Sequence, residues 1–402
     1  MKILLVSDYG TPAGGAEVQL LGLRDELRRR GHDARFFSSS ARTGAGPRGQ
    51  ADYECFGTLS SFRTIVQTAN PSAYRGLRRV LAEFKPDVVH VKLFLTQLSP
   101  LILPLLRLVP SVYYVAWYRP VCPLGTKMLP DGSECRVPYG NPCLSNGCLP
   151  LQDWAPLMLQ MKLWRRWRGV FRLIVANSES TRRFLAADGI DVACVVWHGT
   201  GVRAARPPLS PPPTVSFAGR LVREKGVDIL LHAFAIVSRE LPEARLVIAG
   251  DGPEREGVQL LARKLGIASH VEITGHLTRE ALEFKCEPAW VQAVPSLWAE
   301  PFGIVAVEAM MRGRAVVGTA GGGLSEIIQD GITGYLVPQG DAVSLAEALL
   351  KLLRDRAVAE RMGAAARHDA LLRFSESGFT DQCIKLYQRA ITAGEVRVNG
   401  AA

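Results

Sequence analysis

The chain has 402 residues, of which 48% are hydrophobic and 21% are charged. At roughly 100 to 200 residues per domain, this length favours two domains with sizeable cores. The composition excludes a disordered chain, a collagen-like fibre and a small disulfide-rich scaffold, since there are only eight cysteines. The net charge of +10 predicts an anionic partner: nucleic acid, an acidic membrane surface or a phosphorylated small molecule.

The apolar segments predict neither a signal peptide nor a membrane span. The apolar run from Ile3 ends at Asp8, which is too short for a signal peptide. The longest apolar region, residues 101–117, is interrupted by two prolines and an arginine and falls short of the roughly 20 residues of a membrane-spanning helix. We expect it to form a buried helix and then a buried strand. These features predict a cytoplasmic protein, whose thiols stay reduced.

Strands and helices alternate through the first half of the chain. An apolar strand at residues 2–7 precedes an amphipathic helix at 17–30, whose leucines and arginines fall on opposite sides. Further strands are predicted at 32–37, 87–91, 112–116, 173–176 and 193–197. This alternation predicts an α/β fold with a doubly wound parallel sheet that helices cover on both faces.

A proline-rich stretch separates this half from a second one. Residues 203–213 contain five prolines, which favours a semi-rigid linker over a helix or a central strand. The alternation then resumes with strands at 214–218, 244–249, 271–274, 289–294, 315–317 and 334–337, and helices at 227–240 and 254–265.

These patterns predict the domain organisation. We expect a first domain at 1–202 with an insert at about 118–150, the linker at 203–213, a second domain at 214–374, and a C-terminal helical segment at 375–402 that crosses back to the first domain. Two doubly wound domains place ligands at the carboxyl ends of their strands, in a cleft between the domains.

Common nucleotide motifs are absent from the sequence. The first strand is followed by DYGTPAGGAE rather than by G-x-G-x-x-G, and no P-loop occurs, which excludes the usual hydride-transfer enzymes and P-loop NTPases. Gly14 and Gly15 nevertheless offer backbone at the amino end of a helix, where an anion is favoured. An ordinary strand-to-helix turn explains the two glycines equally well.

The second half carries charged residues in two loops. Arg220 and Lys225 follow the strand at 214–218 and suit a diphosphate, although a solvated basic turn is the simpler alternative. Glu300 and Glu308 lie eight residues apart on either side of a predicted helix start. If the loop is compact, both carboxylates can face one ligand, and they suit sugar hydroxyls better than phosphate.

The motifs GRLVREKGVDILLHAF, AGDGPE and PSLWAEPFGIVAVEAMMRGRAVVGTAGGGLSEIIQDGITGYLVPQGD together resemble retaining glycosyltransferases of family 4, also called glycosyl transferases group 1. The opening MKILLVSDYGTPAGGAE is similar to the first strand and glycine loop of that family. The resemblance implies the GT-B fold, with two Rossmann-like domains facing each other across a cleft. It also implies transfer from a UDP-, GDP- or ADP-linked sugar to a glycan, a lipid-linked acceptor or a metabolite, with no catalytic metal or cofactor.

By this resemblance, Arg220 and Lys225 hold the diphosphate, Glu300 binds the transferred sugar, and these three are the catalytic residues. The other donor-binding residues so implied are Gly14, Gly15, His276, Leu277, Phe302, Gly303, Ile304, Val305 and Glu308. His276 and Leu277 would lie against the base, and Glu308 would bind the ribose hydroxyls.

The chain departs from the family at one position. Members usually carry His-Asp after the strand that corresponds to 112–116, whereas this chain has Ala116 and Trp117. The alternative hypothesis is therefore a catalytically impaired protein that binds a sugar nucleotide and acts as a partner or scaffold. Trp117 either lines an acceptor site or packs in the core.

Two further features leave alternatives open. Cys122, Cys135, Cys143 and Cys148 fall in the predicted insert, where they could hold a structural zinc, form disulfides or remain unlinked thiols. Residues 161–183 contain seven Lys or Arg with two interleaved tryptophans. This pattern is typical of a helix on an anionic membrane surface, or of a packed helix with a solvated basic side. No nucleic-acid-binding module is apparent, so nucleic acid is not an expected partner.

Overall fold

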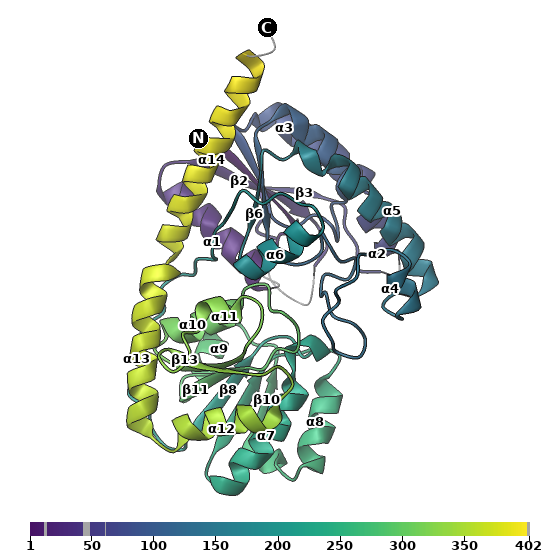
Figure 1. Ribbon diagram of the computed structural model, residues 1–402. Coiled ribbons are helices and arrows are strands. Elements are labelled where there is room, and N and C mark those ends of the chain that lie inside the picture. The colour runs from purple at the N-terminus through teal and green to yellow at the C-terminus, as the bar shows by residue number, and fades with distance from the viewer. Residues whose placement is uncertain (12–13, 43–48, 61, 400–402) are drawn as a thin grey trace. The chain divides into compact units, whose positions relative to one another are not determined.

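The computed structural model describes residues 1–11, 14–42, 49–60 and 62–399 (Figure 1). It divides into two compact units. The first comprises Met1–Pro130, Cys135–Gly201 and Glu376–Ala402, and the second comprises Asp131–Glu134 and Val202–Ser375.

The first unit is built on a parallel sheet in the order β3-β2-β1-β4-β5-β6-β7. Its strands are β1 (Lys2–Tyr9), β2 (Asp33–Ser39), β3 (Tyr53–Cys55), β4 (Val88–Val91), β5 (Ser111–Val115), β6 (Leu173–Ala176) and β7 (Cys194–Val195). Its helices are α1 (Gly15–Arg29), α2 (Arg63–Thr68), α3 (Pro71–Phe84), η1 (Pro100–Leu108), α4 (Pro142–Ser145), α5 (Leu151–Trp167), η2 (Arg168–Val170), α6 (Glu179–Ala187) and α14 (Glu376–Asn399).

The second unit is built on a parallel sheet in the order β10-β9-β8-β11-β12-β13. Its strands are β8 (Thr214–Ala218), β9 (Arg245–Ala249), β10 (Val271–Gly275), β11 (Val291–Val294), β12 (Ala315–Thr319) and β13 (Gly334–Val337). Its helices are η3 (Arg223–Lys225), α7 (Val227–Glu240), α8 (Arg255–Lys264), η4 (Ala268–His270), α9 (Arg279–Lys285), α10 (Ile304–Met311), α11 (Leu324–Ile327), α12 (Ala342–Leu353) and α13 (Arg356–Arg373).

Each unit has its own hydrophobic core. In the first unit, leucines of α1 and apolar residues of α14 cover the sheet, and α14 runs alongside α1 (Figure 1). In the second unit, α7 and α12 pack against each other and against the strands. The central strands β4, β5, β11 and β12 are buried along their whole length, as expected for sheets covered on both faces. The expectation of two doubly wound α/β units is confirmed.

The observed elements follow the predicted alternation closely. The strands at 173–176, 214–218 and 334–337 and the helix at 227–240 have the predicted bounds. The region after residue 100 differs, because it forms a 3-10 helix, η1, with Pro104 inside it. Proline has no amide hydrogen to donate, so Pro104 cannot make the backbone hydrogen bond of a regular helix at its position. No described helix is long and apolar enough to cross a membrane.

The proline-rich stretch 203–213 is attached to the second unit. The Arg206 amide donates to the Arg312 carbonyl at 3.0 Å, and the Leu209 amide donates to Glu360 at 3.0 Å. The Trp290 indole donates to the Ser210 carbonyl at 2.8 Å. The stretch thus has a fixed course along this unit.

Candidate functional site

The order of the second sheet reverses between β8 and β11. The chain continues from β8 outward through β9 and β10, and from β11 outward through β12 and β13. In doubly wound sheets, ligands bind at the carboxyl ends of the strands beside such a reversal. The loop after β8 carries Arg220 and Lys225, and the loop after β11 carries Glu300.

Glu300 is only 7% exposed and accepts four hydrogen bonds. Lys225 Nζ donates to both carboxylate oxygens at 2.9 Å. Ser296 Oγ and Trp298 Nε1 donate to Oε2 at 2.9 and 2.8 Å. Lys225 Nζ also lies 5.3 Å from the centroid of the Trp298 ring, within the range of a cation–π contact. The ion pair therefore joins the two loops.

The pKa of Glu300 is lowered from its usual value. Burial alone would raise it, but the charge of Lys225 and the hydrogen bonds from Lys225, Ser296 and Trp298 outweigh burial. Glu300 is therefore an ionised carboxylate at neutral pH, and Lys225 is its counter-ion.

Two glycines allow the backbone of these loops its observed course. Gly226 has a φ of 62°, and a Cβ there would lie 2.1 Å from the Pro295 carbonyl oxygen. Gly303 has a φ of 103°, and its Cβ would lie 2.6 Å from Leu324. Because any side chain would be strained and would clash, both positions require glycine. Gly226 thus lets the loop that carries Lys225 approach the loop that carries Glu300, and Gly303 lets the start of α10 approach Leu324 of α11.

Arg220 lies in the same loop as Lys225 but is far more exposed. Its side chain is 69% exposed, and its Nη2 lies 3.7 Å from Glu224 of the same loop. That distance is longer than a hydrogen bond, and an exposed pair of this kind is weak. The guanidinium is therefore able to turn toward an anion.

Ile304 and Val305 begin α10, and Gly303 and Phe302 immediately precede them. Gly303 is the N-cap, and no side chain among the described residues caps this helix end. Amides in a first helical turn have no acceptor within the helix, so they favour an anion there. The ring of Phe302 is buried against Phe374, with 5.9 Å between centroids.

Glu308 has a different partner from Glu300. Glu308 lies about one turn after the start of α10, and Arg203 Nη2 donates to its Oε1 at 2.7 Å. The Glu308 side chain is 21% exposed. The two carboxylates that the sequence analysis expects to face one ligand are therefore each held by a separate cation.

The remaining predicted donor residues lie at the carboxyl ends of other strands. His276 is exposed and Leu277 is half-buried, and both follow β10 in the same sheet. Gly14 and Gly15 belong to the first unit, where Gly14 is the exposed N-cap of α1 and Gly15 is its first residue.

The first sheet has its own reversal, between β1 and β4, where Asp8 organises a loop. The buried Asp8 carboxylate accepts hydrogen bonds from the amides of Thr96, Gln97 and Leu98 at 2.9, 2.7 and 2.9 Å. The Thr96 hydroxyl adds a fourth at 2.6 Å. Sequence reasoning missed this role, although an acidic residue that ends an apolar strand is a usable signal.

Ala116 and Trp117 occupy the position where the resembled family carries histidine. Both are half-buried. The Ala116 carbonyl accepts a hydrogen bond from Asn177 at 3.4 Å, and a Cβ on Gly125 would lie 3.2 Å from the Trp117 ring. The Trp117 ring is therefore in contact with the loop that follows it.

The insert cysteines do not fit a metal. Cys122, Cys135, Cys143 and Cys148 are unlinked and half-buried. Burial raises the pKa of Cys143 and Cys148, and neighbouring cysteines add to the rise. Over the described parts of the chain, no three His, Cys, Asp or Glu residues come close enough to hold a metal ion. The structural zinc expected as one alternative is therefore unsupported, as are disulfides.

Of the two alternatives for residues 161–183, the structure supports a packed helix with a solvated basic side. Trp164 is 1% exposed, packs among Phe94, Tyr113 and Phe171, and donates to the Pro120 carbonyl at 3.0 Å. It is thus a core residue and not a boundary tryptophan. The basic side chains that remain exposed are Lys162, Arg165, Arg166, Arg182 and Arg183.

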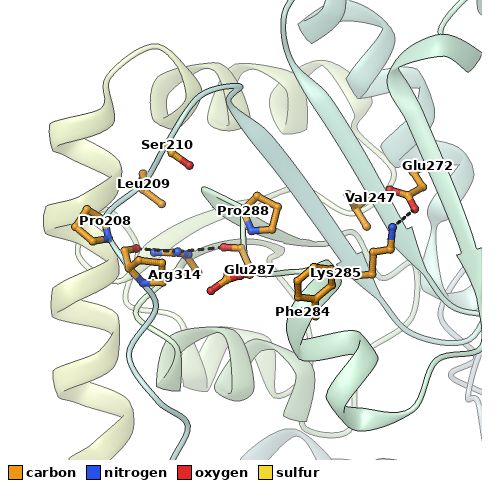
Figure 2. A pocket seen from close by; sticks show the side chains of 11 residues that line it. Pro208, Leu209, Ser210, Val247, Glu272, Phe284, Lys285, Glu287, Pro288 and Arg314 are labelled. Atoms are coloured by element: carbon orange, nitrogen blue, oxygen red, sulfur yellow. Dashed lines mark hydrogen bonds and ion pairs between the residues drawn. The ribbon is translucent and has the colours of Figure 1, made fainter.

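A pocket of about 500 Å³ lies at the opposite, amino edge of the second sheet (Figure 2). Its walls include Leu209 before β8, Pro288 before β11 and Arg314 before β12. Its cations are already engaged: Arg314 donates to two backbone carbonyls at 3.2 Å, and Lys285 pairs with Glu272 at 2.5 Å. Neither Lys225 nor Glu300 lines this pocket.

Sequence reasoning also missed Ser296, Trp298 and Arg203. Ser296 and Trp298 stand four and two residues before Glu300 in the motif PSLWAE, so their proximity in sequence was a usable signal. Arg203 lies 105 residues from Glu308, and no local pattern connects the two.

The chain matches two family models and several known proteins. The model of the glycosyl transferase 4-like domain matches residues 14–196, and that of glycosyl transferases group 1 matches residues 203–369. A phosphatidyl-myo-inositol mannosyltransferase of Mycobacterium leprae is 34% identical over 182 residues, which are 45% of this chain and 48% of that protein. A D-inositol 3-phosphate glycosyltransferase of Mycobacterium avium is 37% identical over 241 residues, or 55% of each. The chain thus spans about half the length of the curated relatives it matches.

Solved structures resemble the chain over nearly its whole length. Sucrose-phosphate synthase from Thermosynechococcus elongatus has a TM-score of 0.75 at 21% identity, covering 98% of this chain and 100% of that one. The Anabaena protein Alr3699/HepE, in complex with UDP and glucose, has a TM-score of 0.68 at 19% identity, covering 96% and 99%. With two family models matching in order and with this fold, the chain belongs to the glycosyl transferases group 1 family and has the GT-B fold.

Proposed function

We propose that the chain is a retaining glycosyltransferase that uses a UDP-, GDP- or ADP-sugar and needs no catalytic metal. The observation that carries the proposal is the Lys225–Glu300 pair at the reversal of the second sheet, next to the first-turn amides of α10. This arrangement places a fixed cation, the amino end of a helix and an ionised carboxylate together. A sugar diphosphate needs all three.

The hydrogen bonds of Lys225 and Glu300 suggest how the donor is held. Lys225 uses two of its three N–H groups on Glu300, which leaves the third for a phosphate oxygen. Oε2 of Glu300 accepts three hydrogen bonds and Oε1 accepts one. Oε1 is therefore the atom that has room for a sugar hydroxyl.

In the proposed reaction, the bond between the anomeric carbon and the diphosphate oxygen breaks, and its electron pair stays on the diphosphate. The acceptor oxygen bonds to the anomeric carbon on the same face, and its proton passes to the departing phosphate. Arg220 and Lys225 stabilise the charge that develops there, in the way that preorganised cations lower such barriers. His276 and Leu277 would line the base, and Gly14 and Gly15 would contribute backbone amides.

The acceptor is proposed to be a glycan, a lipid-linked sugar or a metabolite. The phosphatidyl-myo-inositol mannosyltransferase and the D-inositol 3-phosphate glycosyltransferases among the relatives are consistent with an inositol-containing or lipid-linked acceptor. Since the cysteines are unlinked, we place the protein in a reducing compartment, the cytoplasm.

We also propose that the first unit meets an anionic membrane surface. The helices α2 and α5, which pack together, expose Ile65 and Leu159 at 61% and 50%, and Phe62, the N-cap of α2, is 67% exposed. Basic side chains lie on the same helices, among them Arg63 and Arg165. Exposed apolar and basic side chains together suit an acidic bilayer.

Flotation with liposomes tests the membrane proposal. Wild-type protein should float with vesicles that contain anionic lipid and should remain unbound with neutral vesicles. Phe62→Ser with Ile65→Ser should abolish flotation. As a control, Arg78→Gln with Arg79→Gln on the exposed side of α3 should have little effect. Equal flotation of the wild type and the Phe62/Ile65 variant would refute the proposal.

A donor panel tests the enzyme proposal against the scaffold alternative, which rests on Ala116. UDP-, GDP- and ADP-sugars are incubated with the protein and with acceptors, and both transfer and donor hydrolysis are measured. The proposal predicts turnover of at least one donor. A nucleoside diphosphate that binds without any sugar donor being consumed would favour the scaffold. Failure of every nucleotide to bind would reject both.

A further inference from the structure

An arginine-rich ion network surrounds the carboxylate proposed to bind ribose. Three arginines, two of them in the proline-rich stretch, converge on Glu283 of α9 and Glu308 of α10. All five side chains belong to the second unit. The arginine side chains are nearly buried, with exposures of 8% for Arg203, 11% for Arg206 and 7% for Arg312.

Glu283 is the hub of the network. Arg312 donates to both of its oxygens, Nε to Oε2 at 2.9 Å and Nη2 to Oε1 at 2.5 Å. Arg206 Nη2 donates to Oε2 at 2.6 Å and to the Glu283 carbonyl at 2.5 Å. Burial would raise the pKa of Glu283, but the hydrogen bond and charge of Arg312 and the charges of Arg206 and Arg203 lower it. Glu283 thus neutralises charge mainly for Arg312 and Arg206.

Arg203 is the residue that links this hub to Glu308. Its Nε lies 3.4 Å from Glu283 Oε1, whereas its Nη2 donates to Glu308 Oε1 at only 2.7 Å. A charge-assisted bond of that length is a strong one. The backbone of Arg203 is fixed as well, because Arg367 Nη1 donates to its carbonyl at 2.9 Å. Arg203 is therefore anchored at both ends.

We infer that Arg203 is a positioning residue, which holds the Glu308 carboxylate so that Oε2 faces the ribose hydroxyls of the donor. The inference rests on the proposed function, since it concerns how the same site recognises ribose. With Oε1 committed to Arg203, the carboxylate has one oxygen and one orientation left for the nucleotide. The carboxylate therefore does not use both oxygens on the two ribose hydroxyls; Oε2 alone accepts from them, in one direction.

Loss of Arg203 changes where Glu308 is held. The charge of Glu308 is also felt by Arg312, so without Arg203 the remaining cation draws the carboxylate toward the Glu283 hub. Discrimination of ribose therefore depends on Arg203, although we place no direct contact between Arg203 and the nucleotide.

The test is calorimetric binding of nucleoside diphosphates. UDP, GDP and ADP are first compared on wild-type protein, and the tightest binder is then compared with its dideoxy analogue, which lacks both ribose hydroxyls. Arg203→Met should weaken binding of the ribonucleotide by about tenfold, the scale of one hydrogen bond to a charged group, and should leave the dideoxy analogue unaffected. Arg203→Lys, which keeps one donor, should recover part of the loss.

Arg206→Met is the matched control, because Arg206 touches Glu283 but has no contact with Glu308. It should leave the ratio of ribonucleotide to dideoxy affinity unchanged, even if it lowers the unfolding temperature as much as Arg203→Met does. Glu308→Gln should reproduce the loss of ribose discrimination, and adding Arg203→Met to it should cost little more.

The outcomes separate the inference from the proposed function. Equal weakening of both nucleotides in Arg203→Met, or no weakening at all, overturns the positioning role while the site itself stands. Absence of any nucleoside diphosphate binding to wild-type protein overturns the proposed function, and the positioning role with it.

Discussion

Replacement of Lys225 by methionine removes the counter-ion of a buried carboxylate. Methionine keeps most of the length of the side chain, but it cannot donate to Glu300 and it loses the cation–π contact with Trp298. Glu300, at 7% exposure, would keep the hydrogen bonds from Ser296 and Trp298 and would lose both bonds from the ammonium. We expect a large loss of stability in the second unit.

The expected magnitude is about 3 kcal/mol. Removing one partner of a buried ion pair typically costs about 3 to 5 kcal/mol, and the lower end applies because the Lys225 side chain is 18% exposed. The loss should be largest at neutral pH. The pKa of Glu300 is lowered in the native protein from 4.5, so its contribution to stability is present above pH 4.5 and disappears as the pH falls through the native pKa.

Urea unfolding of single and double variants measures this effect. In a double-mutant cycle, Lys225→Met with Glu300→Gln should be less damaging than the sum of the single variants, since no uncompensated buried charge remains. Lys285→Met is the control. Its pair with Glu272 is short, at 2.5 Å, but its two side chains are 40% and 52% exposed, and such pairs contribute less than about 1 kcal/mol. Equal destabilisation by Lys225→Met and Lys285→Met would refute the reasoning.

Three further predictions concern other parts of the molecule. Arg220→Ala should lower kcat/KM for the donor, through a loss of about 2 to 4 kcal/mol in transition-state stabilisation. The unfolding temperature should change little, because Arg220 is exposed. An unchanged kcat/KM would show that Arg220 does not belong to the site. Lys92 is fully buried, and burial lowers its pKa from 10.5 to about 7 despite the charges of Glu17 and Cys383. Between pH 7 and pH 10.5 the unfolded chain therefore binds a proton at Lys92 that the folded chain does not. From pH 7 to pH 9 the free energy of unfolding of the wild type should rise by roughly 2 kcal/mol relative to that of Lys92→Met. Parallel plots of unfolding free energy against pH for the two proteins would contradict this. Metal analysis of the purified protein should find no stoichiometric zinc, and one zinc ion per chain would show that the insert cysteines rearrange around a metal.

The fold could be predicted well because local patterns determine it. The strand at 214–218 and the helix at 227–240 have apolar spacings that local sequence reveals directly, and their observed bounds agree. The helix after residue 100 was predicted as an element, but its 3-10 form, with Pro104 inside it, was not. The covering of the first sheet by α14 joins residues nearly 300 positions apart, such as Tyr387 and His90 at 2.8 Å.

The site could be predicted only in part. Lys225 and Glu300 carry motif signals in their own loops, so their chemistry was visible before their contact was known. The partner of Glu308 could not be predicted. Arg203 lies 105 residues away in the sequence, in a stretch whose prolines indicate only a linker. For Trp164 the sequence left two alternatives open, a membrane-surface helix and a packed helix with a solvated basic side, because helical spacing alone does not show which side faces the core. Its neighbours Lys162 and Arg165 are exposed while its own ring is buried, as the second alternative expects.

Hydrogen–deuterium exchange with and without a bound nucleoside diphosphate tests the central claim most directly. That claim is that the ligand binds at the carboxyl edge of the second sheet, in the loops around Lys225 and Glu300. Protection is predicted in residues 219–226 and 295–308, with the amides at the start of α10 among the most protected. Protection confined to the stretches around the pocket of Figure 2, at residues 207–210 and 284–288, would contradict it.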